Sequence, residues 1–371
     1  MKKICIAMPT TTAGGGVEEM GAALVNYFVR KGLDVTVLCL YRHPRREVDI
    51  SAQAKVYSIG APSRFKWAFC IWWLIAYTRF YRQHEFDVVL SRIPWHSFFV
   101  ACSLRLSKSQ PPLFVTVHNP IKRHLSGRAS IIDFMSRAFI RLSVGRVDGF
   151  ACVSEHVAEN VREVIGNRTA RVKALYNPVM DTTREHGSGT WTRRKVRRRL
   201  GVDDESVLII SIGRLSYQKG HDILLQTMTS LPRHFRLLVV GDGPEHRRLT
   251  DLAQTLAVET RVSFLGYRRD IGEVLVAADV FALASRWEGF GNVFVEALAH
   301  QLPVVTTTCP GGQVEVLQHG RFGYLVSPES PSELARAIQE ASRNGPNKNT
   351  RWKDFTVDTI GQDYLRFMAL D

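Results

Sequence analysis

Residues 285–298 read Ser-Arg-Trp-Glu-Gly-Phe-Gly-Asn-Val-Phe-Val-Glu-Ala-Leu, and this stretch decides how the second half of the chain folds. Just before it, residues 280–283 form an apolar run typical of a buried strand. After the glycines, residues 292–300 have a helix-forming composition in which Val293, Ala297 and Leu298 can face a core. The stretch therefore predicts a strand, a glycine-containing turn and the start of a helix.

Two glutamates flank the predicted helix start. A helix N-terminus carries unpaired N–H groups and partial positive charge, which suit a phosphate or a polar sugar face. Glu288 lies on the turn and Glu296 on the second helical turn, so both carboxylates can reach one crevice. Because carboxylates do not bind phosphate, we predict that they accept hydrogen bonds from hydroxyls, one on a sugar and one on a ribose. The alternative is that both are solvated surface residues.

A second element in the same half of the chain carries two cations. Residues 208–212 form a buried-type strand, and the loop that follows, residues 213–220, contains Arg214 and Lys219. An arginine fork and a lysine point charge on one loop after a parallel-type strand fit a diphosphate. The alternative is two solvated surface cations.

Together these elements resemble the retaining glycosyltransferases of family 4 (glycosyl transferases group 1), which have the GT-B fold. The resemblance rests on four motifs in order: Gly-Arg-Leu-x-x-x-Lys-Gly at 213–220, Val-Val-Gly-Asp-Gly-Pro-Glu at 239–245, the two glutamates with seven residues between them, and Pro-Val-Val-Thr at 303–306 followed by Gly311, Gly312 and Glu315. It is specific over about residues 206–330 and looser over the first half.

The resemblance implies an α/β architecture of two Rossmann-like, doubly wound domains that face each other across a cleft. Residues 1–178 would be the acceptor-side domain, 179–205 a linker, 206–355 the nucleotide-sugar-binding domain, and 356–371 a helix crossing back to the first domain. The strand and helix alternation in both halves is itself typical of doubly wound parallel sheets.

The resemblance also implies roles for individual residues. Arg214, Lys219, Glu288 and His118 would form the catalytic set, with Glu288 on the sugar hydroxyls and His118 close to the transferred sugar, through its side chain or its backbone carbonyl. Glu296 would hold the ribose hydroxyls. The remaining donor-binding residues would be Gly266 and Tyr267 beside the nucleobase, and the backbone of Phe290, Gly291, Asn292 and Val293 around the diphosphate and sugar.

The first half begins with a strand at residues 3–8, a glycine-containing loop and a helical pattern from residue 17 to 30. Gly15 and Gly16 precede that helix and allow close backbone approach to a phosphate, and Glu18 completes the Gly-Gly-x-Glu variant of the resembled family. A structural role for the glycines is the alternative. His118 follows the predicted strand 113–117, at the strand end where ligands bind in parallel sheets.

Composition sets outer bounds on the function. The chain has 371 residues and a formal net charge of +14, which favours an acidic partner such as nucleic acid, anionic lipid or a phosphorylated substrate. The six cysteines lack metal-binding spacing and are interpreted as reduced thiols of a cytosolic protein, with no room for a signal peptide before the first strand. Without an Asp-x-Asp pair or zinc-type spacing, we expect no metal and no cofactor.

Three segments bear on membrane contact. Residues 65–81 are rich in tryptophan and tyrosine and form either a helix packed on the sheet or an interfacial helix. Residues 121–146 carry basic residues among apolar ones and suit an anionic membrane surface or a lipid diphosphate, or form a solvated helix face. The basic run 193–199 is interpreted as a solvated linker helix, so we expect no nucleic acid.

The sequence thus predicts a metal-independent retaining transferase that moves a hexose or N-acetylhexosamine from a UDP-sugar to a lipid-linked or cell-envelope saccharide at the inner face of the cytoplasmic membrane. The resemblance implies a same-face displacement in which the departing phosphate takes the acceptor's proton. The alternatives are a GT-B nucleotide-sugar epimerase and a basic nucleic-acid-binding protein. Residues 309–315 depart from the family's Cys-Pro-Ser-Gly-Pro-x-Glu pattern near the sugar, which leaves the choice of donor open.

Overall fold

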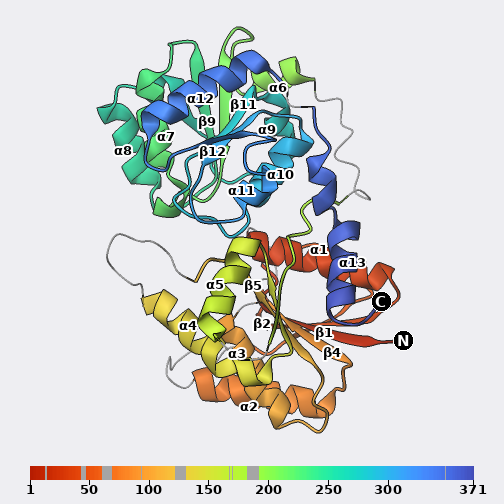
Figure 1. Ribbon diagram of the computed structural model, residues 1–371. Helices are drawn as coiled ribbons and strands as arrows, with labels where there is room; N and C mark the ends of the chain where they lie inside the picture. Colours follow the sequence, from red (N-terminus) through yellow and green to blue (C-terminus); the bar gives the residue numbers. More distant parts are fainter. Residues whose placement is uncertain are drawn as a thin grey trace. The chain divides into compact units, whose positions relative to one another are not determined.

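The computed structural model describes residues 1–12, 15–42, 47–60, 69–92, 94–121, 131–166, 168, 170–181, 192–346 and 348–371, without the side chains of residues 69–71, 95 and 131–136. The chain divides into two compact units (Figure 1). Unit 1 comprises Met1–Asp181 and Phe355–Asp371, and unit 2 comprises Thr182–Asp354.

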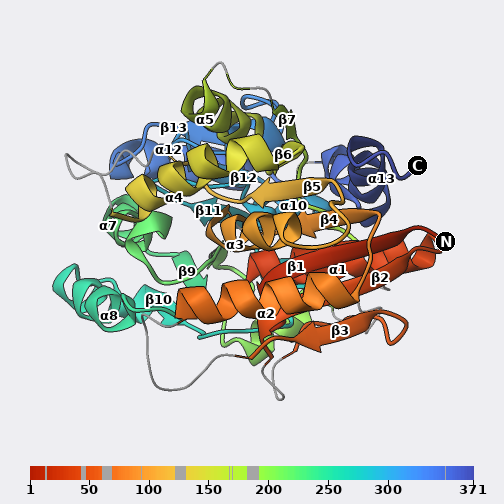
Figure 2. The ribbon, with the colours of Figure 1, turned by 90° about the horizontal axis from the view of Figure 1, so that it is seen from below.

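Unit 1 is built on a seven-stranded parallel sheet with the order β3-β2-β1-β4-β5-β6-β7. Figure 2 shows these strands from the β3 edge to the β7 edge. Their bounds are β1 (Lys3–Thr10), β2 (Asp34–Tyr41), β3 (Lys55–Ser58), β4 (Val88–Ser91), β5 (Leu113–Val117), β6 (Gly149–Cys152) and β7 (Arg171–Ala174).

Helices cover both faces of this sheet, which is why its inner strands are apolar on both sides. The helices of unit 1 are α1 (Gly16–Arg30), α2 (Phe69–Gln83), α3 (Pro94–Arg105), α4 (Ile131–Ser143), α5 (Glu155–Ile165) and α13 (Val357–Phe367). Ile4, Ile6 and Met8 of β1 pack with side chains of α1 and α13. The intervening Cys5 contacts Tyr81 of α2 instead, with Sγ 3.8 Å from the hydroxyl.

Unit 2 repeats the arrangement with a six-stranded parallel sheet in the order β10-β9-β8-β11-β12-β13. Its strands are β8 (Val207–Ile212), β9 (Phe235–Val240), β10 (Val262–Phe264), β11 (Val280–Leu283), β12 (Val304–Thr307) and β13 (Tyr324–Val326). Its helices are α6 (Arg193–Arg199), α7 (His221–Ser230), α8 (His246–Thr255), α9 (Ile271–Ala277), α10 (Asn292–Ala299), α11 (Gln313–Val316) and α12 (Pro331–Asn344).

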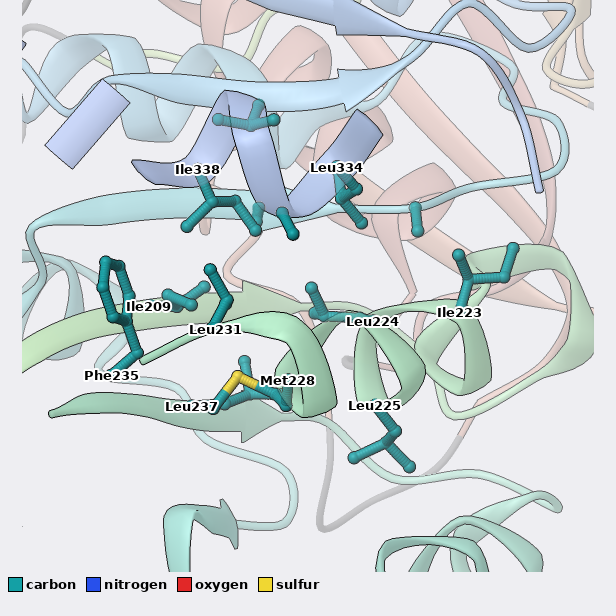
Figure 3. Packing of buried hydrophobic residues seen from close by; sticks show 14 of the residues in the cluster. Ile209, Ile223, Leu224, Leu225, Met228, Leu231, Phe235, Leu237, Leu334 and Ile338 are labelled. Atoms are coloured by element: carbon teal, nitrogen blue, oxygen red, sulfur yellow. The ribbon is translucent and has the colours of Figure 1, made fainter. Parts of the chain in front are cut away.

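The core of unit 2 lies between the sheet and helices α7 and α12. Leu334 and Ile338 of α12 point toward Ile209 of β8 and Leu224 of α7 (Figure 3). On the other face of the sheet, Phe281 of β11 meets Phe294 of α10 edge to face, with ring centroids 5.7 Å apart. Alternate residues of each strand therefore bury on opposite faces.

The α/β prediction is confirmed, and strands β5 and β11 have the predicted bounds. Ser154 caps α5 by accepting a hydrogen bond from the Val157 N–H at 3.2 Å. The sequence analysis missed β3, whose four residues are mostly exposed at the sheet edge and carry no apolar run.

Helix α2 packs within unit 1. Tyr77 and Tyr81 are buried, and Trp73 meets Phe99 of α3 edge to face. The described part of the aromatic segment is therefore a helix packed on its unit, whereas residues 65–68, with Trp67, lie outside the described residues. Of the basic segment 121–146, residues 122–130 lie outside them too.

The helix predicted at residues 193–199 is present as α6, and five of its seven residues are exposed, but the other two are not solvated. Val196 and Arg197 of α6 are buried, and the Arg197 guanidinium donates to Asp279 at 3.0 Å and to the Ser206 carbonyl at 2.6 Å. Arg193 also pairs with Asp279, and Arg199 pairs with Glu273 of α9. Carboxylates remote in the sequence neutralise this basic run, which local composition does not reveal.

Gly220, before α7, allows two segments of unit 2 to approach closely. Its φ is +63°, in the left-handed region, and a Cβ there would overlap the carbonyl of Ala284, at the end of β11. Gly201 has a similar φ of +67° but nothing within 4 Å of its Cβ position. Both glycines have a left-handed backbone, but only at Gly220 would a side chain also overlap a neighbouring segment.

We expect Gly201→Ala to cost about 1–2 kcal/mol of unfolding free energy, the cost of a left-handed alanine. Gly220→Ala should cost roughly 1–3 kcal/mol more, because the backbone at Ala284 must move. Urea denaturation of both variants measures the difference. Equal losses would show that the contact with Ala284 does not constrain residue 220.

Candidate functional site

The predicted donor-site residues of unit 2 lie on loops that follow parallel strands, and these loops share one edge of the sheet. The strand order reverses between β8 and β11, so the loop after β8 and the turn after β11 are neighbours there. This is the switch point at which doubly wound sheets bind ligands. Residues 213–220 and 284–291 occupy it.

Lys219 and Glu288 form an ion pair at this point. The Lys219 ammonium lies 2.7 and 2.9 Å from the two Glu288 carboxylate oxygens, and the Ser285 hydroxyl donates to the same carboxylate at 2.6 Å. The side chain of Lys219 is 17% exposed and that of Glu288 4%. The two residues to which the sequence assigns separate roles, on the diphosphate and on the sugar, are thus bonded to each other in this structure.

Arg214 lies on the same loop but in a different environment. Its side chain is exposed, and among the described residues it makes no ion pair or hydrogen bond. Lys219 is anchored by contrast, since its aliphatic stem runs along Gly213. The loop therefore carries one engaged cation and one exposed cation.

The turn after β11 ends in the helix start that the sequence predicts. Gly291 has a φ of +86° and precedes α10, which begins at Asn292. A Cβ at Gly291 would collide with the Phe294 ring, so the position requires glycine. Phe290 is buried, whereas Asn292 and Val293 are half-buried in the first turn of α10.

Glu296 lies one turn further along α10. Burial raises the pKa of its carboxyl to about 7, and its Oε2 atom has no hydrogen-bond partner in the described part of the chain. A buried carboxyl oxygen without a donor is costly unless the group is protonated or a ligand supplies a donor. Of the two glutamates, Glu288 is thus paired within the protein and Glu296 is not.

Gly266 and Tyr267 follow β10 at the same edge of unit 2. The Gly266 carbonyl accepts a hydrogen bond from the Gly241 N–H at 2.8 Å, and the Gly266 φ of +67° turns the chain. Tyr267 is exposed. Unit 2 therefore brings together, on one sheet edge, all the site residues predicted for the second half of the chain.

The other predicted site residues lie in unit 1, at the carboxyl ends of its strands. Gly15 is the N-cap of α1, Gly16 its first residue, and Glu18 lies in its first turn. A Cβ at Gly15 would collide with the Glu18 carboxylate, whose pKa is raised by burial. The Glu18 side chain thus folds back over Gly15, and any larger residue at position 15 would displace it.

His118 directly follows β5, and its Nε2 atom is buried without a partner among the described residues. Burial, together with the nearby Arg92 guanidinium, holds its pKa well below the usual range, so the imidazole is neutral at pH 7. Arg92, after β4, is itself fully buried and donates to the Val17 carbonyl of α1 at 3.1 Å. Sequence reasoning missed Arg92, since a lone arginine after a strand carries no signal.

Sequence reasoning also missed Arg286, although it lies in the stretch that decides the fold. Its guanidinium pairs with Asp222 of α7, 2.9 Å away, and with Glu329 before α12. These partners are 64 and 43 residues away in the sequence, so no local pattern predicts them.

The described residues contain no group of three or more His, Cys, Asp and Glu side chains placed to hold a metal ion. None of their helices combines the length and the apolar character needed to cross a membrane.

Comparison with known proteins identifies relatives of both halves. Residues 14–183 match the family described as Glycosyltransferase Family 4, and residues 192–356 match that described as Glycosyl transferases group 1. The lipopolysaccharide core biosynthesis glycosyltransferase LpsE of Rhizobium meliloti is 32% identical over 62% of this chain and 66% of its own length.

A second relative is the N-acetylgalactosamine-N,N'-diacetylbacillosaminyl-diphospho-undecaprenol 4-alpha-N-acetylgalactosaminyltransferase of Campylobacter jejuni. It is 29% identical over 43% of this chain and 46% of its own length. The matches thus span about half to two thirds of these two relatives. The crystal structure of Anabaena HepE in complex with UDP and glucose aligns over 100% of both chains with a TM-score of 0.81 and 21% identity. The resemblance stated from the sequence is confirmed: the chain belongs to the family 4, group 1 glycosyltransferases and has their GT-B fold.

Proposed function

We propose that the protein is a metal-independent retaining glycosyltransferase. It moves a hexose or N-acetylhexosamine from a UDP-sugar to a hydroxyl of a lipid-linked or cell-envelope saccharide. The observation that carries the proposal is the switch-point edge of unit 2, where two cations, a helix N-terminus and two carboxylates converge. This set matches the parts of a nucleotide-sugar, with cations for phosphates and carboxylates for hydroxyls.

The difficult step is departure of the nucleotide diphosphate, so stabilising its charge should be the largest catalytic contribution. Arg214, Lys219 and the N–H groups at the start of α10 supply positive charge for it. Glu296, with its unpartnered oxygen, accepts from the ribose hydroxyls, and Glu288 accepts from the sugar. Tyr267 lies beside the nucleobase.

The transfer itself is a same-face displacement. The bond between the anomeric carbon and the phosphate oxygen breaks, and the acceptor oxygen bonds to that carbon from the same side. The departing phosphate takes the acceptor's proton, so no protein base is needed. The role that the family resemblance implies for His118, on the transferred sugar, is part of this proposal, and its neutral imidazole can both donate and accept a hydrogen bond.

The relatives support the donor and acceptor classes. Anabaena HepE binds UDP and glucose, and a second structure holds UDP-glucose. LpsE is named for lipopolysaccharide core biosynthesis, and the Campylobacter jejuni enzyme acts on a diphospho-undecaprenol-linked sugar.

Thermal unfolding with UDP, GDP, ADP, dTDP and CMP, each with EDTA, tests the donor class. At one hundred times its dissociation constant, UDP should stabilise the protein by roughly 2.7 kcal/mol. Glu296→Ala and Lys219→Ala should lose much of that shift, whereas Glu340→Ala, an exposed glutamate on α12, should keep it. If no nucleotide stabilises the wild type, unit 2 has no donor site and the proposal fails.

The buried carboxyl of Glu296 also predicts a pH dependence without ligand. Its folded-state pKa of about 7 lies above the ordinary glutamate value, so the folded chain keeps a proton that the unfolded chain loses. Stability should therefore fall as pH rises from about 4.5 to 7 and then level off. Glu296→Gln should match the wild type at pH 4.5 and exceed it at pH 8 by at most about 3 kcal/mol. The urea midpoints of both proteins across this pH range measure their difference in stability. A difference that does not change with pH would contradict a raised pKa of Glu296 in the folded state.

A lipid-linked acceptor would bring unit 1 to the inner face of the cytoplasmic membrane. In support, a hollow of about 390 Å³ in unit 1 is lined by Arg105 and Arg146 among other residues. The exposed leucines Leu106 and Leu142 lie beside it in the sequence. Basic heads and exposed apolar side chains together suit an anionic lipid surface.

Sedimentation with phosphatidylglycerol and phosphatidylcholine vesicles tests this partner. The wild type should bind the anionic vesicles only, and reversing both charges (Arg105→Glu with Arg146→Glu) should abolish binding. Reversing Arg236, a control arginine in unit 2, should leave it unchanged. Equal binding of the double charge-reversal variant and the wild type to anionic vesicles would exclude this surface as the membrane contact.

A further inference from the structure

The Arg286 side chain satisfies its complete hydrogen-bonding capacity within unit 2. Nη1 and Nη2 donate to the two oxygens of Asp222, both at 2.9 Å. Nε and Nη2 donate to the oxygens of Glu329 at 2.6 and 3.2 Å, and Nη1 also donates to the Tyr217 carbonyl at 2.8 Å. These are five bonds, one for each N–H of a guanidinium. A lysine has three donors and no planar fork, so it cannot reproduce them.

The same residue ties the backbone of two loops together. The Arg286 N–H donates to the Gln218 carbonyl at 2.7 Å, and the Gln218 side chain donates to the Trp287 carbonyl at 3.0 Å. The Tyr217 ring stacks on the guanidinium, with its centroid 3.9 Å from the central carbon. Segments 217–218 and 286–287 are therefore fastened to each other by a backbone hydrogen bond, a side-chain hydrogen bond and the stacking of Tyr217 on Arg286.

Each fastened segment immediately precedes one member of the Lys219–Glu288 pair. Tyr217–Lys219 form a single short 3₁₀ turn, and Glu288 follows Trp287 directly. The orientation of the pair thus depends on the relative position of the two segments.

Of the two ion pairs of Arg286, the one with Asp222 is largely shielded from solvent. Arg286 is 10% exposed and Asp222 14%, so their bidentate pair is screened little by solvent. Glu329 is exposed, but its φ of +56° places it in the left-handed region, which costs a residue with a Cβ energy.

We propose that Arg286 is a positioning residue that sets the alignment of Lys219 with Glu288 in the donor site. This inference rests on the proposed function. Arg286 acts through the two segments and does not touch the donor, because all of its donors are already engaged. Its effect should fall mainly on the transition state, where the charge on the departing diphosphate is greatest.

Arg286→Lys tests the proposal, because it keeps the charge and removes the fork. The matched control is Arg261→Lys, whose guanidinium binds the carbonyls of Met228, Leu231 and Pro232 at the end of α7. The readouts are hydrogen–deuterium exchange of the peptide 215–221, the dissociation constant of UDP, and the rate of UDP release from UDP-glucose or UDP-N-acetylglucosamine, whichever the wild type turns over.

In Arg286→Lys we expect exchange in residues 215–221 to quicken tenfold or more. The rate of UDP release from the UDP-sugar should fall on the order of tenfold to a hundredfold, because small misalignments of catalytic groups reduce rates by such factors. The dissociation constant of UDP should change less. Arg261→Lys should change none of the three. Wild-type exchange or turnover in Arg286→Lys, or equal losses in the control, would overturn the inference.

If Arg286→Lys does not fold, Asp222→Asn replaces it with the same expectations, since it keeps the shape of the partner and removes its charge. The two hypotheses fail in different ways. A wild type that binds no UDP contradicts the proposed function, while the exchange of residues 215–221 still decides whether Arg286 fastens the loop.

Discussion

The ion pair between Lys219 and Glu288 is the constraint on which the loops at the switch point of unit 2 depend. It joins two loops 69 residues apart, and the carboxylate is almost wholly buried. A buried charge is tolerated only with a partner, so the two loops must meet in one geometry. The glycines follow from it: Gly213 leaves room for the lysine stem, and Gly220 lets the loop approach Ala284.

The pair also changes how positive charge is distributed over this edge. Lys219 is neutralised by Glu288, so the exposed charge of the loop is that of Arg214. A diphosphate would meet Arg214 and the start of α10 first and would compete with Glu288 for Lys219. Other basic residues of unit 2 pair within the protein, as Arg193 and Arg197 do with Asp279. The net charge of +14 is therefore a poor guide to the partner.

Unit 1 shows a related use of a buried charge. Arg92 lies beneath α1, and its proximity helps keep His118 neutral. The N-terminus of α1, the end of β4 and the end of β5 are thus coupled through one guanidinium. Because these segments come from three separate strand and loop units, no periodicity in the sequence indicates the coupling.

The sequence by itself determined the α/β class, most strands, the start of α1 to within one residue, the start of α10 at Asn292, and the family. These follow from apolar runs, glycine placement and short motifs, which act over a few neighbouring residues. Only the tertiary structure decided that Glu288 is paired whereas Glu296 is not, that Arg197 and Arg199 of α6 pair with Asp279 and Glu273, and that Arg286 connects two loops. The physical reason is that ion pairing and burial depend on side chains brought together by strand order, across separations of tens of residues that local patterns do not encode.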